Sequence, residues 1–325
     1  MTLARRHVLQ LPLGAAAWLT AQRPAYSQAY PTKSVRILVG VPPGGTFDIV
    51  ARLISQWLSQ RLGQQFVIEN RPGANTTLAT NMVAHSDPDG YTLILLGSPA
   101  PINVTLYSNL SFDFARDIVP VAGIESMPLL MVVQPSLPAK TIPEFIEYAK
   151  SKPGQINVGC GGVGATGHVA GALFSMLTGI TTTFVPYRGE APALTDLLGG
   201  RVQAVFATAA SAINYVRQGQ LRALAISSET KFDGLPDVPS FTKFLPSYQA
   251  SSWAGIGAPK NTPAAITEIL NREINAALLD PAIKARLTDF AAEPMPGSVD
   301  RFQKFVSDEI EKWAKVIKFA NIKPA

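Results

Sequence analysis

Two glycine-rich loops carry the residues best suited to binding an anion. Residues 157–168 read NVGCGGVGATGH, in which Gly159, Gly161 and Gly164 have the spacing G-x-G-x-x-G. Between a strand and a helix, such glycines let the pyrophosphate of a dinucleotide approach the backbone N–H groups. The same bare amides can bind another small anion at a helix N-terminus. A related loop, PPGGTFD, occupies residues 42–48, so the sequence indicates two backbone sites for anions.

The residues after the next strand argue against a dinucleotide. That fingerprint is followed, about 20 residues on, by an acidic residue that binds the ribose. Here the expected strand 184–185 leads into PYR, and the first acid, Glu190, lies beyond it in a loop. Arg188 would suit a 2′-phosphate, but residues 42–48 do not match the fingerprint. A dinucleotide-dependent enzyme using the turn from Gly159 to Gly164 therefore stays as the less favoured alternative.

Side chains for catalysis or metal binding are few. Cys160 is the only cysteine, so no intrachain disulfide is possible, and beyond the N-terminal segment only His85 and His168 remain. A transition-metal site needs several such ligands. A nucleophilic Cys160 would need a base and an orienting residue, and the sequence offers no obvious set. We therefore expect Cys160 to be a small packed residue, and we predict no catalytic residue, no metal and no cofactor.

The first 29 residues have the pattern of a cleaved export signal. Two arginines at positions 5–6 precede an apolar run over residues 8–21, and SQA at residues 27–29 suits signal peptidase. The arginine pair resembles a twin-arginine signal, with the Sec route left open. An anchor is less favoured, because Pro12 and Gly14 interrupt the run and a spanning helix takes about 20 apolar residues. We expect cleavage after Ala29 and a periplasmic protein.

The charge and length of the mature chain limit its partners. The signal removes three of the 28 basic side chains and none of the 23 acidic ones, which leaves 25 and 23, a net charge of +2. A chain so nearly neutral gives no reason to expect nucleic acid or anionic lipid as a partner. No later apolar run is long enough to cross a bilayer, and the length fits two domains of about 100–200 residues each.

The two halves of the chain repeat one order of elements. Strand, glycine-rich loop, helix, glycine and strand follow one another in each half. Helices with one apolar face end at Gly63 and Gly179. Two β-α-β-α-β units with right-handed connections predict a parallel sheet in each half. The expected strands are residues 35–41, 66–68 and 91–96 in the first half and residues 156–158, 184–185 and 202–206 in the second.

The repeat predicts a two-lobed α/β protein. We assign residues 30–126 to lobe 1, residues 127–251 to lobe 2, and residues 252–325 to a crossover back to lobe 1 with the C-terminal helices. Within this scheme, the extended segments 128–136 and 251–260 cross between the lobes. The C-terminal portion should contain helices over residues 262–279 and 299–320, the second of them amphipathic.

The loops that follow the strands are glycine-rich or built of small residues. In open parallel sheets, ligands bind outside the carboxyl ends of the strands, where these loops lie. Several lead directly into helices, whose first N–H groups lack partners and whose dipole favours an anion. One exposed helix N-terminus contributes only about 0.3–1 kcal/mol, so several must converge on one ligand. The loops are residues 42–48, 72–77, 97–101, 159–168, 187–192 and 207–211.

The longer segments around these loops resemble a known family. VPPGGTFDIVARLISQWLSQRLGQQFVIENRPGAN, DPDGYTLILLGS, GHVAGALFSMLTGI, VPYRGEAPALTDLLGGRVQAVF and GQLRALAISS occur in order over nearly the whole mature chain. Together they are similar to the tripartite tricarboxylate transporter receptors, the Bug or TctC-like solute-binding proteins. The resemblance implies a monomeric, type II-like Venus flytrap that closes on a small carboxylate and delivers it to membrane permease subunits.

The resemblance also implies which residues bind the ligand. In the family, the Pro-Gly-Gly loop of the first lobe holds one ligand carboxylate through backbone groups and water. Other loops of both lobes complete the pocket. The matching positions are Pro42, Pro43, Gly44, Gly45, Thr46, Asp48, Gly73, Ala74, Asn75, Thr76 and Ser98 in lobe 1, and Gly161, Gly162, Gly164, Thr166, His168, Ala207 and Thr208 in lobe 2.

Two departures from the family bear on the ligand. GANTT at residues 73–77 adds Asn75 and Thr76 where relatives commonly have Gly-Ala-Gly-Gly. Ala207 stands where relatives commonly have Asp. Loss of that acid argues against a ligand ammonium group. We therefore expect a mono- or dicarboxylate, aliphatic or aromatic, rather than an amino acid.

Some of these side chains have other possible roles. Asp48 could equally cap its helix, and His168 could pack its helix rather than touch a ligand. Arg188 could pair with Glu190, and Trp253 could be buried in a crossover strand instead of lining the pocket. A periplasmic sensor for a signalling partner would share the same fold and pocket, so that alternative to transport stays open.

Overall fold

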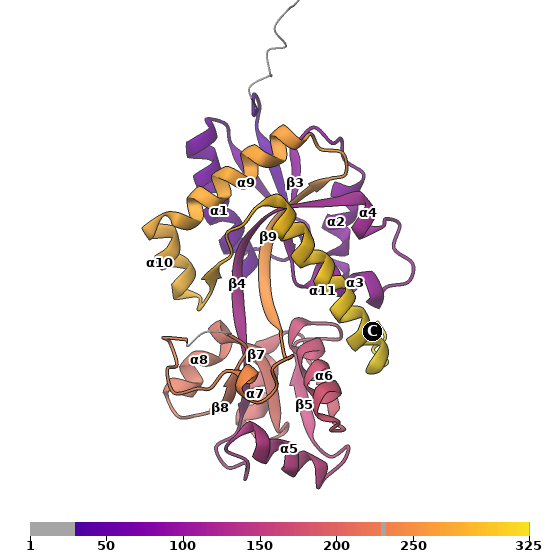
Figure 1. Cartoon of the computed structure of the whole chain (residues 1–325), viewed down its shortest axis with the longest axis vertical. Coiled ribbons are helices and arrows are strands. Elements are labelled where there is room, and N and C mark those ends of the chain that lie inside the picture. Colours follow the sequence, from indigo (N-terminus) through magenta and orange to yellow (C-terminus); the bar gives the residue numbers. More distant parts are fainter. Residues whose placement is uncertain (1–29, 229–231, 325) are drawn as a thin grey trace, which may run out of the picture.

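The computed structural model describes residues 30–228 and 232–324. The expected signal peptide and its cleavage site lie outside these described residues. Figure 1 shows two lobes of α/β structure, joined by the long strands β4 and β9. Helix α11 runs from the first lobe toward the second.

Lobe 1 is built on three parallel strands. Strand β1 pairs with β2 on one side and with β3 on the other, with Val35 opposite Phe66 and Arg36 opposite Thr92. Helices cover both faces of these strands, so β1 and β3 are apolar almost throughout, as buried parallel strands are. The elements are β1 (Val35–Val39), α1 (Thr46–Leu62), β2 (Phe66–Asn70), η1 (Ala74–Thr76), α2 (Thr77–Ala84), β3 (Thr92–Gly97), α3 (Pro99–Leu106) and α4 (Phe114–Asp117).

Lobe 2 repeats this arrangement. Strand β5 pairs in parallel with β6 and with β7, with Val158 opposite Phe184 and Ala204. The first helix, α5, begins at a capping box in which Thr141 accepts a hydrogen bond from the backbone N–H of Glu144. The elements are α5 (Ile142–Lys150), β5 (Asn157–Cys160), α6 (Thr166–Thr178), β6 (Thr183–Pro186), α7 (Glu190–Leu198), β7 (Ala204–Thr208), α8 (Ala209–Arg217), β8 (Arg222–Ile226) and η2 (Phe241–Lys243).

Strand β4 (Ile118–Val133) belongs to both sheets. Its first part, up to Pro128, pairs antiparallel with β9 (Ser251–Pro259) in lobe 1. From Leu129 onward it pairs with β7 and β8 in lobe 2. The two central strands of the hinge therefore run against each other, and each predicted parallel trio is extended by antiparallel neighbours.

The C-terminal elements return to lobe 1 and then reach lobe 2. Helix α9 (Ala264–Leu279) packs on α1 and β4, and it is followed by α10 (Pro281–Asp289) and the short strand β10 (Glu293–Pro294). Helix α11 (Val299–Phe319) packs its first half in lobe 1 through Phe302 and Val306. Its second half, with the fully buried Trp313, joins the core of lobe 2. The sequence did not predict this second contact.

The expected strands and helices are confirmed, with boundaries that shift by a few residues. The expected helix over residues 299–320 is α11, and the expected strand 35–41 is β1. The main difference is β4, because the expected crossover 128–136 is the end of a strand that begins at Ile118. The lobe boundaries at residues 126 and 251 remain predictions. In the part of the chain that the structure describes, no helix has both the length and the apolar composition to cross a membrane.

Candidate functional site

The carboxyl ends of the parallel strands in the two lobes face each other across the hinge. In lobe 2, Thr208 at the end of β7 lies opposite Leu129, the residue at which β4 enters that lobe. In lobe 1, Gly97 at the end of β3 lies opposite Ala254, near the start of β9. The loops predicted from the two halves therefore lie at facing edges, as a ligand site between the lobes requires.

Two of the predicted residues touch across this boundary. Ser98, which follows β3, is fully buried, and its Oγ lies 2.8 Å from Oγ1 of Thr166, the first residue of α6. Nearby, Gly164 packs against Leu106 of α3 so closely that a Cβ at this position would overlap the leucine side chain. The left-handed conformation of Gly164 (φ 74°) also favours glycine. The two lobes thus meet at the predicted site.

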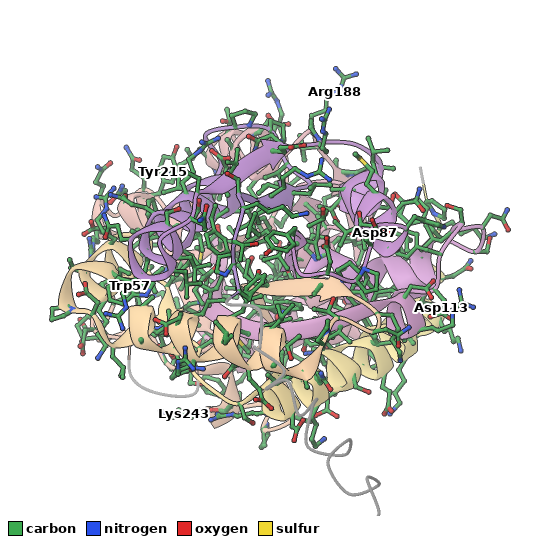
Figure 2. The ribbon with its side chains drawn as sticks, turned by 90° about the horizontal axis from the view of Figure 1, so that it is seen from above. Trp57, Asp87, Asp113, Arg188, Tyr215 and Lys243 are labelled. Atoms are coloured by element: carbon green, nitrogen blue, oxygen red, sulfur yellow. The ribbon has the colours of Figure 1, made fainter. Side chains whose placement is uncertain are left out.

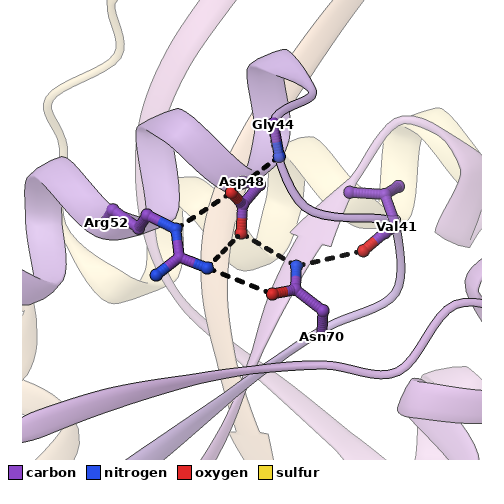
Figure 3. Close-up of polar contacts among 5 residues, drawn as sticks. All are labelled: Val41, Gly44, Asp48, Arg52 and Asn70. Carbon is purple, nitrogen blue, oxygen red and sulfur yellow. Dashed lines mark hydrogen bonds and ion pairs between the residues drawn. The ribbon is translucent and has the colours of Figure 1, made fainter.

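An ionic cluster around the buried carboxylate of Asp48 fixes the loop of residues 42–48 (Figure 3). Asp48 lies in the first turn of α1 and is only 2% exposed. Its Oδ2 accepts hydrogen bonds from the Gly44 N–H (3.0 Å) and from Arg52 Nε (2.9 Å). Its Oδ1 accepts from Asn70 Nδ2 (2.8 Å), which also donates to the Val41 carbonyl (3.1 Å). The carboxylate therefore holds Gly44 directly and Val41 through Asn70.

The charge of Asp48 is stabilised by these contacts. Burial alone would raise its pKa, but the hydrogen bonds from Arg52, Gly44 and Asn70 outweigh that effect and lower the pKa from 3.8 to about 2. The contacts with Gly44, Arg52 and Asn70 give Asp48 a structural role in fixing the loop. Contact between Asp48 and a ligand stays a prediction.

The loop of residues 73–77 has an unusual backbone. Ala74, Asn75 and Thr76 all have positive φ, a conformation that is rare outside glycine and least suited to a β-branched residue such as threonine. Strained backbone of this kind clusters at ligand sites. The Asn75 side chain donates to Asn103 Oδ1 (2.8 Å), and Asn103 donates in return to the Asn75 carbonyl (2.6 Å). Asn103 of α3, which sequence reasoning missed, thus holds the loop in place.

A neutral histidine fixes the loop of lobe 2. His168 is 6% exposed, packs at a 50° tilt against the Phe184 ring, and accepts a hydrogen bond at Nδ1 from the Gly164 N–H (3.1 Å). Burial lowers its pKa from 6.5 to about 4. The ring is therefore uncharged at neutral pH, as its acceptor role requires, and it orders the loop from within.

The glycines of the G-x-G-x-x-G turn face protein atoms. A Cβ on Gly161 would lie 3.2 Å from the Glu190 backbone nitrogen, and a Cβ on Gly164 would overlap the Leu106 side chain. Burial raises the pKa of the Cys160 thiol, and the residue is 2% exposed. These contacts give the glycines a packing role and leave Cys160 as a packed residue, so nothing here supports the dinucleotide alternative.

An acidic residue that the sequence analysis did not assign to the site stands at its edge. Glu190, the first residue of α7, accepts hydrogen bonds from the Thr208 N–H (3.3 Å to each oxygen) and from the Thr208 hydroxyl (2.8 Å). Arg188, its suggested partner, instead points out into solvent (Figure 2). The signal for this contact is absent from the sequence, because the two residues are 18 positions apart.

Comparison with known proteins identifies the family. The family model described as the tripartite tricarboxylate transporter family receptor matches residues 50–322. The chain belongs to this family. Protein BugT of Bordetella pertussis (strain Tohama I) is 35% identical over 298 residues, which are 91% of this chain and 91% of BugT.

Two solved structures extend this result to the fold. Rpa4515 of R. palustris, solved with adipate, is 36% identical, with a TM-score of 0.78 over 91% of this chain and 100% of that one. MatC (Rpa3494) from Rhodopseudomonas palustris, with bound malate, is 33% identical, with a TM-score of 0.74 over 89% of this chain and 100% of that one. The two-lobed solute-binding fold and the resemblance drawn from sequence are both confirmed.

In this receptor the remaining predicted residues differ in exposure. Pro42, Pro43, Gly44 and Gly45 are exposed, Thr46 and Gly162 are partly buried, and Ala207 is fully buried. Trp253 is also fully buried, and its Nε1 donates to Glu309 of α11 (3.2 Å). Trp253 therefore anchors the hinge strand rather than lining the facing loops.

A well-formed cavity of the receptor lies elsewhere. It has a volume of about 300 Å³ and is lined by hinge residues such as Ser126 and Ser251 together with Glu309 and Lys312 of α11. None of the predicted ligand-binding residues lines it. The predicted loops, in contrast, lead into the helix N-termini and meet at the Ser98–Thr166 contact, and ligand binding by them stays a prediction.

Proposed function

We propose that the protein is a periplasmic solute-binding receptor that captures a small mono- or dicarboxylate and delivers it to the permease of a tripartite tricarboxylate transport system. The observation that carries the proposal is the Ser98–Thr166 contact, which joins predicted ligand-binding loops from opposite lobes. The adipate bound by Rpa4515 and the malate bound by MatC support a carboxylate as ligand.

Helix N-termini supply the chemistry of this site. Helix α1 begins at Thr46, α3 at Pro99 and α6 at Thr166, and each follows a loop at the facing edges. Their unpaired N–H groups and dipoles favour a carboxylate, and convergence of several makes the effect large enough for binding. Ligand binding of this kind involves no bond making, so we propose a receptor without catalytic turnover.

Export and partners complete the proposal. The arginine pair and apolar run of the first 29 residues support secretion to the periplasm. The receptor acts there as a monomer and meets the membrane permease subunits transiently. Nothing in its nearly neutral mature charge suggests nucleic acid or anionic lipid as a further partner.

A thermal-shift screen of the mature protein against carboxylates of graded length and aromaticity tests the proposal. A ligand at 100 times its Kd should stabilise the folded state by about 2.7 kcal/mol, which raises the melting temperature. Amino acids such as glutamate should have little effect. Tight binding of amino acids with none of the simple acids would contradict the proposal.

Substitution at the interlobe contact sharpens this test. Thr166→Val should weaken binding of the acid found in the screen. It also removes the partner of the buried Ser98 hydroxyl, so the free protein should lose about 1 kcal/mol of stability. Thr183→Val is the matched control. Thr183 lies at the amino end of β6, away from the predicted loops, and donates its hydroxyl to the Gly154 carbonyl. If Thr166→Val binds with unchanged affinity, Thr166 is not part of the site.

A further inference from the structure

We propose that Glu190 is a specificity-determining residue that sets the orientation in which the ligand binds. It directs the ligand carboxylate to lobe 1 and, for the end held by lobe 2, selects a hydrogen-bond-donating group such as a hydroxyl over a second carboxylate. The favoured ligands are therefore hydroxylated monocarboxylates rather than dicarboxylates. This inference rests on the proposed function.

The Glu190 carboxylate occupies an anion position of lobe 2. Thr208 is the N-cap of α8, and both of its donors, the N–H and the hydroxyl, are directed at Glu190. Ser211 Oγ lies 2.8 Å from the Thr208 hydroxyl and extends this cluster. The N-terminus of a helix is where a ligand carboxylate would gain most from backbone dipoles. At α8 that place is already filled by a carboxylate of the protein itself.

Glu190 stands between the loops that form the site edge of lobe 2. The backbone at Gly189 and Glu190 packs on Gly161, and the Gly189 N–H donates to the Gly161 carbonyl (3.2 Å). On the other side, Glu190 reaches Thr208 at the carboxyl end of β7, the end that faces lobe 1. The side chain is partly exposed at this edge of lobe 2.

Among the described residues, no cation neutralises the charge of Glu190. Among residues 30–228 and 232–324, none of the ion pairs includes Glu190, and Arg188 points to solvent. His168, which belongs to another loop of this lobe, is uncharged at neutral pH. A second ligand carboxylate at this end would meet an uncompensated negative charge, whereas a hydroxyl could donate to it.

Lobe 1 has the opposite character. Its acidic residue, Asp48, is buried and paired with Arg52 through two hydrogen bonds (2.9 and 3.1 Å). The exposed part of its loop, residues 42–45, has no charged side chain and leads into the N-terminus of α1. A ligand carboxylate therefore meets amides in lobe 1 and a carboxylate in lobe 2. This difference orients the ligand, with its carboxylate toward lobe 1 and its other end toward lobe 2.

Calorimetric titration with ligands that differ only at one end tests the proposal. Suitable sets are butyrate, 4-hydroxybutyrate and succinate, and the six-carbon equivalents hexanoate, 6-hydroxyhexanoate and adipate. The wild type should bind the hydroxy acid at least about tenfold more tightly than the diacid of the same length, about 1.4 kcal/mol. Glu190→Gln keeps an acceptor for Thr208 but removes the charge, so it should reduce this preference about tenfold or more, mainly by tightening diacid binding.

The control and the contradicting outcomes are distinct. Glu268→Gln removes an equal charge from an exposed position on α9 and should leave the preference unchanged. If acids bind but Glu190→Gln has the same selectivity as the wild type, Glu190 only caps α8, and the inference is wrong while the proposed function stands. If no acid binds either protein, the proposed function fails, and this inference fails with it.

Discussion

The two glycine-rich loops at the site perform the same task with different chemistry. In lobe 1, an ionised carboxylate, Asp48, ties the Gly44 amide to α1 and is itself paired with Arg52. In lobe 2, an uncharged imidazole, His168, ties the Gly164 amide to α6. Both loops follow the first parallel strand of a lobe, and both residues lie within the first turn of the next helix.

This difference determines how each half responds to acid. Asp48 keeps its charge down to a pH of about 2, so its loop is held throughout the physiological range. His168 must stay uncharged to accept its hydrogen bond, and its pKa of about 4 in the folded state lies below the ordinary value of 6.5. Acid should therefore weaken the loop of lobe 2 before that of lobe 1.

The largest expected effect is the pH dependence of stability. Between pH 6.5 and 4 the unfolded chain binds a proton at His168 and the folded chain does not, so stability falls as pH falls, by about 3 kcal/mol in all.

Glu125 of β4 acts in the opposite sense. Burial raises its pKa from 4.5 to about 8, so its folded form keeps a proton and stability falls as pH rises from 4.5 to 8.

The two effects should cancel in the wild type between pH 4.5 and 6.5. Above pH 6.5 only Glu125 remains, and stability should fall toward pH 8. Both Glu125 oxygens are buried without a hydrogen-bond partner among the described residues, so Glu125→Gln removes the titration and breaks no bond. In that variant, denaturant unfolding should show stability rising from pH 4.5 to 6.5 and then constant. The rise should vanish when His168→Gln is added; a flat profile in Glu125→Gln alone would contradict the role of His168.

Removal of the lobe 1 anchor should have the next largest effect. Asp48→Ala leaves the Gly44, Arg52 and Asn70 donors without their acceptor, so it should reduce the free energy of unfolding by about 2 kcal/mol and weaken carboxylate binding. Asp48→Asn, which keeps one acceptor, should lose less. Chemical denaturation and titration with the ligand measure the two effects.

The matched control for Asp48 is an exposed pair of the same spacing. Asp308 pairs with Lys304 on α11, and both side chains are more than half exposed. Asp308→Ala should change stability by less than about 0.5 kcal/mol and leave binding unchanged. If Asp48→Ala behaves like Asp308→Ala, the ionic cluster does not hold the loop.

The sequence predicted the strands and loops of the two lobes better than the contacts between segments that are far apart in the chain. Hydrophobic runs and glycines located the strands and the loops that follow them, because local period and turn chemistry are visible over a few residues. The i,i+4 spacing of Asp48 and Arg52 is also a readable signal. Contacts between distant segments, such as Glu190 with Thr208, have no local signature. The passage of β4 through both sheets has no local signature either, because its apolar run is equally typical of a strand that only links the lobes.

The smallest predicted effect tests the contact that brings the two loops together. Gly164 and Gly179 both have left-handed backbone (φ 74° and 68°), so alanine at either should cost about 1 kcal/mol of strain. A Cβ at Gly179 meets nothing within 4 Å, whereas one at Gly164 overlaps Leu106 of the other lobe. Gly164→Ala should therefore destabilise the free protein by about 1 kcal/mol more than Gly179→Ala.

A Leu106→Ala background identifies the source of that excess. Leu106 belongs to a continuous core that includes residues of α3, α6 and α11, so the interlobe contact is part of the folded unit. Removing the leucine side chain makes room for the new Cβ, and the two glycine substitutions should then cost the same, as measured by denaturant unfolding. Equal costs already in the wild-type background would mean that Gly164 and Leu106 are apart in solution. The loops of the two lobes would then be brought together only by the ligand.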